Sequence, residues 1–117
     1  MTIQNLVKLL KENFKCEVYR QGSLPESVPY PDRFFTYKNT SSDFSEYSDN
    51  TEKTLEVDIS LYFYSRSLND VFETLSKARD ILKKEGWLCP TAGTDTPTDD
   101  PDYSARMIKI IKEERNI

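Results

Sequence analysis

TLEVDISLYFY, at residues 54–64, is the stretch that decides the fold. Its apolar side chains alternate without a break with polar or tyrosine side chains; they are Leu55, Val57, Ile59, Leu61 and Phe63. Successive side chains of a strand point to opposite faces, so the alternation predicts a central strand with one buried face. At the usual rise per residue it is roughly 35 Å long.

Two helical patterns flank this strand and can cover its buried face. In residues 2–13 the apolar side chains follow one helical face and are Ile3, Leu6, Val7 and Leu10. Residues 67–85 carry a longer stripe of Leu68, Val71, Phe72, Leu75, Ala78 and Leu82. Ser67, with Asp70 three positions later, resembles a capping box, and Gly86 is placed to end the helix. The predicted core is Leu6, Leu10, Val57, Ile59, Leu61, Phe63, Val71, Phe72, Leu75 and Leu82.

Shorter strands complete the predicted sheet, at residues 14–19, 33–38, 87–88 and 103–112. The element order is therefore α-β-β-β-α-β-β. The fold class is α+β, a two-layer sandwich whose mostly antiparallel sheet is covered on one face by two helices. We expect a single domain over residues 1–117, with mobile loops near 39–53 and 90–102, because these polar stretches cannot bury enough surface to order themselves.

The bulk composition argues against several classes of function. The chain has no histidine, which removes Ser-His-Asp and Cys-His catalysis, His-ligated zinc and imidazole bases. Its net charge of −4 argues against tight binding of nucleic acid, which needs a clustered positive surface. No segment approaches the roughly 20 apolar residues that span a bilayer, so we expect no membrane contact. The two cysteines, Cys16 and Cys89, are too few for a disulfide framework.

Carboxylates are the remaining candidates for chemistry. Glu56 and Asp58 lie two apart on the central strand and share a face, but no third ligand follows at a spacing typical of a metal site. The four aspartates within residues 95–102 lack the central Gly and terminal Glu of a calcium loop. Both groups are predicted to be solvated surface. We expect no catalytic residue, no metal and no cofactor, and therefore no enzyme.

Four aromatic residues lie at positions outside the predicted core. Tyr62 and Tyr64 alternate out of phase with the buried stripe of the central strand, and Phe44 and Tyr47 lie in a polar stretch. Aromatic side chains in such places are common at interfaces, so these four are the predicted subunit interface. The alternative is that they pack locally against the flanks of the helices.

Several short motifs occur in a distinctive order. PYPDRFFTY at residues 29–37 leads from a Pro-rich segment into an aromatic strand, and SDN at 48–50 ends the polar loop before the long strand. GW at 86–87 closes the second helix, and DDPDY at 99–103 precedes a final strand at 106–112. This order, over nearly the whole chain, resembles that of the small tail-completion or tail-terminator (head–tail joining) proteins of long-tailed bacteriophages and prophages.

The resemblance implies a structural virion protein, assembled in the bacterial cytoplasm, whose subunits form a homo-oligomeric ring that is commonly a hexamer. Such a ring caps the tail tube and meets the head connector, so the tail-tube protein and the connector are the implied partners. No catalytic residue carries over. An acidic wall would repel DNA passing through the ring, and Glu56 and Asp58 are the candidates to line that channel.

Three other classes stay open. Head-proximal connector and minor capsid proteins of the same phages are similar in size and composition. A small bacterial adaptor or binding domain without catalysis would use the exposed aromatic residues. An enzyme would have to rely on carboxylates alone, and a pair with perturbed pKa values in a deep pocket would favour it.

Overall fold

The computed structural model describes residues 2–21, 30–46 and 53–116, with side chains described for 3–21, 30–39 and 56–113. Its elements are α1 (Thr2–Phe14), β1 (Glu17–Arg20), β2 (Arg33–Glu46), β3 (Lys53–Ser65), α2 (Leu68–Lys84), β4 (Thr94–Thr96) and β5 (Ser104–Asn116). The predicted order α-β-β-β-α-β-β and the α+β class are confirmed. No helix in the described part of the chain is long and apolar enough to cross a bilayer.

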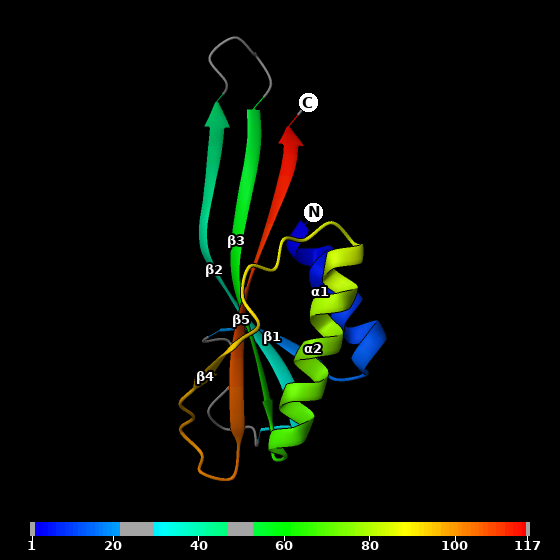
Figure 1. Ribbon diagram of the computed structural model, residues 1–117, viewed down its shortest axis with the longest axis vertical. Coiled ribbons are helices and arrows are strands. Elements are labelled where there is room, and N and C mark those ends of the chain that lie inside the picture. Colours follow the sequence, from blue (N-terminus) through cyan, green and yellow to red (C-terminus); the bar gives the residue numbers. More distant parts are fainter. Residues whose placement is uncertain (1, 22–29, 47–52, 117) are drawn as a thin grey trace.

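The strands form one sheet in the order β1-β2-β3-β5-β4, with β3 in the middle (Figure 1). β3 pairs antiparallel with both β2 and β5, and β4 pairs antiparallel with β5. The sheet is mostly antiparallel as predicted, and the exception is β1, which pairs parallel with β2. A parallel pair needs a crossover of about a dozen residues, and residues 21–32 supply that length between the two strands.

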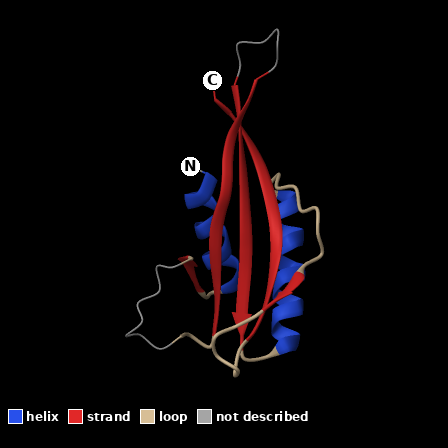
Figure 2. Cartoon of the chain, turned by 90° about the vertical axis from the view of Figure 1, so that its left-hand side faces the viewer, coloured by secondary structure: helices blue, strands red, loops and turns tan. Residues whose placement is uncertain are grey.

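Both helices lie on one face of the sheet, as Figures 1 and 2 show, and the core lies between them and the strands. Nine of the ten predicted core residues are buried: Leu6, Leu10, Val57, Ile59, Leu61, Phe63, Val71, Leu75 and Leu82. The structure adds others that the periodicity did not single out, among them Phe35, Trp87, Ile108 and Ile110. Burial of these side chains is the main term that holds the two layers together.

Phe72 is the predicted core residue that lies outside the core. Its side chain is 46% exposed, and that of Leu68, one turn earlier, is 52% exposed. A stripe with i, i+3 and i+4 spacing covers a wide arc of a helix, and only its centre is buried against the sheet, at Val71, Leu75, Ala78 and Leu82. Phe72 lies on the flank, where the Arg106 guanidinium sits 4.4 Å from the centre of its ring.

The ends of α2 follow their local signals. Ser67 is the N-cap, and its hydroxyl accepts a hydrogen bond from the amide of Asp70 at 3.3 Å. Gly86, just past the helix, has a φ of +93°, a conformation that costs glycine little. At the end of α1, Lys15 adopts the left-handed region with a φ of 55°. That turn places Phe14 in the helix, so the first strand begins at Glu17 and not at residue 14 as predicted.

Three strands extend beyond the helices as an arm (Figure 1). It consists of 38–46 of β2, 53–58 of β3 and 112–116 of β5. The predicted end of β2 at residue 38 is wrong, since β2 pairs with β3 as far as Glu46, with a register shift between Asn39 and Ser41. Backbone hydrogen bonds to β3 extend the strand without any apolar pattern. Residues 47–52 of the predicted mobile loop lie outside the described residues.

The C-terminal part differs from the prediction in detail. In place of a strand at 87–88, Leu88 forms an isolated bridge with Ile111. The predicted loop at 90–102 contains the short strand β4. β5 continues to Asn116, past the predicted end at residue 112, because its partner β3 is equally long.

Candidate interaction site

The face of the sheet that the helices leave open carries the aromatic residues expected there. Tyr62 and Tyr64 are half-buried, while Leu61 and Phe63 beside them face the core. Strand pairing places Phe34 of β2 directly opposite Tyr64, and the two rings stack with centroids 4.8 Å apart and planes 5° apart. Cross-strand aromatic pairs of this kind stabilise a sheet and fix the position of both rings.

A pocket of about 450 Å³ lies on this open face, between strand residues of β2 and β3 and the loop that joins β4 to β5. That loop lies at the end of the sheet opposite the arm (Figure 1). We call it the tyrosine pocket. It is lined by Gln21, Tyr30, Phe34, Thr36, Tyr62, Tyr64, Thr96, Pro97, Thr98, Asp99, Asp100 and Tyr103.

Tyr103 holds the two sides of the tyrosine pocket together. Its hydroxyl lies 2.8 Å from the Pro31 carbonyl oxygen and 3.1 Å from that of Tyr30, either of which can accept its hydrogen. The Tyr30 ring meets the Tyr103 ring edge to face, with centroids 5.9 Å apart. Thr98 Oγ1 lies 2.7 Å from the Asp100 carbonyl oxygen and 3.0 Å from that of Tyr103, which fixes the loop above. The walls are therefore positioned by contacts within the chain.

The charge of the tyrosine pocket has one sign. Among the described residues that line it, Asp99 and Asp100 carry the only ionisable carboxyl groups, and none is a lysine or an arginine. Asp100 Oδ1 accepts a hydrogen bond from the Asp102 amide at 2.9 Å. Burial raises the pKa of Tyr64, and the nearby Asp99 carboxylate adds to the rise. Tyr64 therefore keeps its proton at neutral pH and can donate it to an acceptor.

The two predicted channel residues lie further along the same face, in the arm. Strand register places Glu56 directly between Asp43 of β2 and Glu113 of β5. We call these three positions the acidic row, and Asp58 lies on the same face one alternation away. Like charges directly opposite one another disfavour strand pairing, so the pairing of Glu56 with Glu113 is expected to oppose folding locally.

The structure does not bring the four predicted interface aromatics together. Tyr62 and Tyr64 line the tyrosine pocket. Phe44 is paired with Leu55 in the arm, about 23 Å away along the strand at the usual rise. Tyr47 lies outside the described residues. The aromatic residues of the pocket that sequence reasoning missed are Tyr30, Phe34 and Tyr103.

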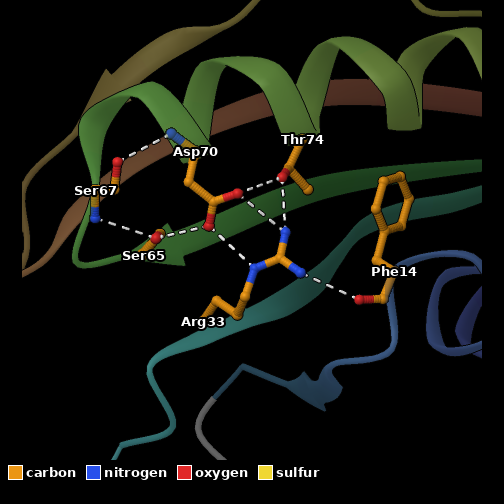
Figure 3. Close-up of polar contacts among 6 residues, drawn as sticks. All are labelled: Phe14, Arg33, Ser65, Ser67, Asp70 and Thr74. Atoms are coloured by element: carbon orange, nitrogen blue, oxygen red, sulfur yellow. Dashed lines mark hydrogen bonds and ion pairs between the residues drawn. The ribbon is translucent and has the colours of Figure 1, made fainter.

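A second polar cluster joins α2 to the sheet (Figure 3). The Arg33 guanidinium donates to both carboxylate oxygens of Asp70, at 3.0 and 3.1 Å. Ser65 and Thr74 also donate to this carboxylate, at 2.8 and 2.9 Å. Arg33 further donates to the Phe14 carbonyl at 3.2 Å, so one side chain ties the end of α1 to the start of α2.

The ionisation of Asp70 depends on this cluster. Burial by itself disfavours the charged carboxylate, but hydrogen bonds from Arg33, Ser65 and Thr74 outweigh it and lower the pKa of Asp70 below its ordinary value of 3.8. Every oxygen of the carboxylate has a partner within the chain. The arrangement is that of a structural joint between elements.

Both cysteines are free thiols, with Cys89 buried and Cys16 half-buried. Burial raises the pKa of each, so both stay protonated at neutral pH. A protonated thiol is a poor nucleophile. Within the described residues, no three His, Cys, Asp or Glu side chains are grouped so as to hold a metal ion.

Comparison with known proteins gives similarity of structure but none of sequence. Neither a protein-family model nor a curated protein sequence matches this chain. A solved structure of the virion of a native gene transfer agent (GTA) particle contains a chain with a similar fold. The TM-score is 0.61, the sequence identity is 11%, and the match covers 97% of this chain and 92% of that one. At this identity the comparison shows that the two chains share a fold over nearly their whole lengths.

Proposed function

We propose that this chain is a structural subunit of a phage or prophage virion, a tail-terminator or tail-completion protein that forms a ring at the head–tail junction. Two observations support the class. The order of its sequence motifs resembles that of such proteins, and its fold matches that of a chain in a virion. Its partners would be further copies of itself, the tail-tube protein and the head connector, and the work would be assembly without catalysis.

The main observation in favour of a ring is that the sheet has two open edges. On the outer side of β2, β1 pairs only with Phe34–Tyr37. On the outer side of β5, the last contact is the bridge between Leu88 and Ile111. Within the described residues, no strand pairs with the outer edge of β2 beyond Tyr37 or of β5 beyond Ile111. Open edges carry unpaired backbone groups, which other chains can satisfy.

The directions of these edges favour a ring over a dimer. β2 and β5 both run antiparallel to β3, so they run parallel to each other. A neighbour related by rotation about an axis along the arm would bring its β2 beside β5 in the same direction. That contact joins two different surfaces, and repeated contacts of this type close into rings. Pairing of β2 with another β2 would instead give an isolated dimer.

The acidic row fits the inner wall of such a ring. It lies on the sheet face opposite the helices, which would leave the helices outside and Glu56 and Asp58 toward the channel. Negative side chains there would repel the phosphates of passing DNA and oppose tight binding. This role would also account for carboxylates that are placed opposite one another at a cost to folding.

The proline substitution Glu113→Pro is expected to abolish ring formation while the subunit stays folded. Ile111 exchanges both backbone hydrogen bonds with Leu88, at 2.8 and 2.9 Å, so its amide points to the outer edge. By alternation the amide of Glu113 points the same way. Proline removes that donor without breaking the pairing with β3. Electron microscopy of phage tail tubes mixed with the protein should show a ring at one end for the natural chain and none for the variant.

Glu113→Ala is the matched control, since it removes the same side chain but keeps the amide, and it should still form rings. Circular dichroism should give similar melting curves for both variants. Rings formed by folded Glu113→Pro would show that the open edge is not the contact. If the natural chain never binds tail tubes or connectors, the virion assignment is wrong. The alternative is then an adaptor domain that uses Tyr62 and Tyr64. Binding to connectors or capsids alone would favour a connector or minor capsid protein.

A further inference from the structure

We propose that the tyrosine pocket binds the guanidinium group of an arginine side chain presented by another protein chain. The inference goes beyond the ring and does not rest on it, because none of the residues that line the pocket belongs to the arm. It would supply a second contact surface, one that recognises a positively charged side chain.

The walls of the tyrosine pocket suit a flat cation. Five of its lining residues are aromatic, namely Tyr30, Phe34, Tyr62, Tyr64 and Tyr103. Phe34 and Tyr103 are buried and support the wall, whereas Tyr30, Tyr62 and Tyr64 are partly exposed. An exposed aromatic face attracts a guanidinium, which is planar, weakly hydrated and able to stack. The volume of about 450 Å³ is ample for one arginine side chain. Because the rings are fixed by stacking and by the Tyr103 hydroxyl, little ordering is needed when a ligand enters.

The charge of the tyrosine pocket selects a cation. Asp99 and Asp100 carry the carboxylates of its described lining, and none of the described lining residues is basic. A carboxylate can accept two parallel hydrogen bonds from one guanidinium, which gives arginine an advantage over lysine. The pKa of Tyr64 is raised, so its hydroxyl near Asp99 stays protonated and uncharged at neutral pH.

The chain itself uses the same combination of groups elsewhere. Three of its arginines lie over an aromatic ring, with the guanidinium carbon 4.4 to 5.2 Å from the ring centroid, and each is paired with a carboxylate. They are Arg33 with Phe63 and Asp70, Arg66 with Tyr103 and Asp32, and Arg106 with Phe72 and Asp95. Tyr103 already carries Arg66 on its ring, but Tyr30, Tyr62 and Tyr64 line the tyrosine pocket beside Asp99 and Asp100 with no basic residue among the described lining residues. We infer that the guanidinium comes from a partner.

The test is an NMR titration of the protein with N-acetyl-arginine methylamide. Its neutral analogue, N-acetyl-citrulline methylamide, has nearly the same shape and serves as the ligand control. We expect the arginine probe to shift the amide signals of residues 62–64, 96 and 98–100, with weaker binding at higher salt. The citrulline probe should bind at least about fivefold more weakly, since it lacks the charge that pairs with the carboxylates.

Variants test whether arginine binds in the tyrosine pocket or is attracted only by the overall negative charge of the protein. Asp99→Asn with Asp100→Asn should weaken arginine binding about five- to tenfold, and asparagine at position 100 can still accept the hydrogen bond from the Asp102 amide. Asp102→Asn, a neighbouring carboxylate outside the lining, should leave binding unchanged. Equal binding of both probes, or shifts centred on Glu56 and Glu113, would overturn the proposal. Neither outcome affects the proposal of a ring, which is tested separately by electron microscopy of tail tubes.

Discussion

Replacing Phe35 by alanine is expected to lower the free energy of unfolding by about 4 kcal/mol. The Phe35 side chain is 0% exposed, and its ring centroid lies 4.7 Å from that of Phe63 and 5.4 Å from that of Phe14. The substitution removes apolar area from the centre of the core and leaves a cavity between β2, β3 and α1. Urea unfolding at pH 7, followed by circular dichroism, measures the loss.

Phe72→Ala is the matched control for this prediction. Sequence periodicity places Phe72 in the core, but its side chain is 46% exposed and contacts Arg106 across its ring. Truncation there should cost no more than about 1 kcal/mol, from lost packing and the cation–π contact. Equal losses at the two positions would show that α2 turns a different face to the sheet.

Replacing Asp70 by asparagine is expected to lower the free energy of unfolding by about 2 kcal/mol at pH 7. The change removes the charge that Arg33 contacts through two hydrogen bonds and leaves the guanidinium partly buried without its counter-ion. About a third of each side chain in the pair is exposed, 36% for Arg33 and 30% for Asp70, so solvent screening keeps the loss below that of a fully buried pair.

The Asp70 carboxylate also makes the free energy of unfolding depend on pH, and the direction of this dependence can be predicted. The pKa of Asp70 is lower in the folded chain than its ordinary value of 3.8, so the unfolded chain binds the proton more tightly. Its contribution to stability is fully present above the ordinary pKa and is lost as the pH falls through the folded pKa. The stability difference between the natural chain and Asp70→Asn should therefore be constant from pH 7 to about pH 5 and shrink below about pH 4.

Asp80, an exposed carboxylate further along α2, provides the comparison. Asp80→Asn should change the free energy of unfolding by less than about 0.5 kcal/mol and should leave the pH profile of the natural chain in place. A difference for Asp70→Asn that stays constant down to pH 3 would mean that the loss comes from packing and not from charge.

The Arg33–Asp70 cluster and the tyrosine pocket lie in different parts of the molecule and serve different ends. The Arg33–Asp70 cluster and the core fix the helices to one face, and the open face, the arm and the tyrosine pocket remain for contacts. In the proposed ring the arm would bind neighbouring copies, and the tyrosine pocket would bind a basic side chain. The two proposals are tested by separate measurements. Electron microscopy of tail tubes tests the ring, and NMR amide signals test binding of arginine to the pocket.

The elements with strong local patterns could be predicted from the sequence. β3 is set by strict alternation, since only one register buries Val57, Ile59 and Leu61 together. The limits of α2 are set by Ser67 and Gly86, whose cap and left-handed turn act within a few residues. The absence of histidine likewise restricts the chemistry regardless of the fold.

Tertiary structure alone decided the rest, because it depends on partners distant in sequence. β2 reaches Glu46 since β3 lies alongside and pairs with its backbone, although its side chains carry no strand pattern. Phe72 is exposed because the rotation of α2 on the sheet is set by how the whole stripe packs, which spacing along one helix cannot specify. The tyrosine pocket joins Tyr30, Tyr64 and Tyr103, three residues that only the pairing of β2, β3 and β5 and the loop before β5 bring together.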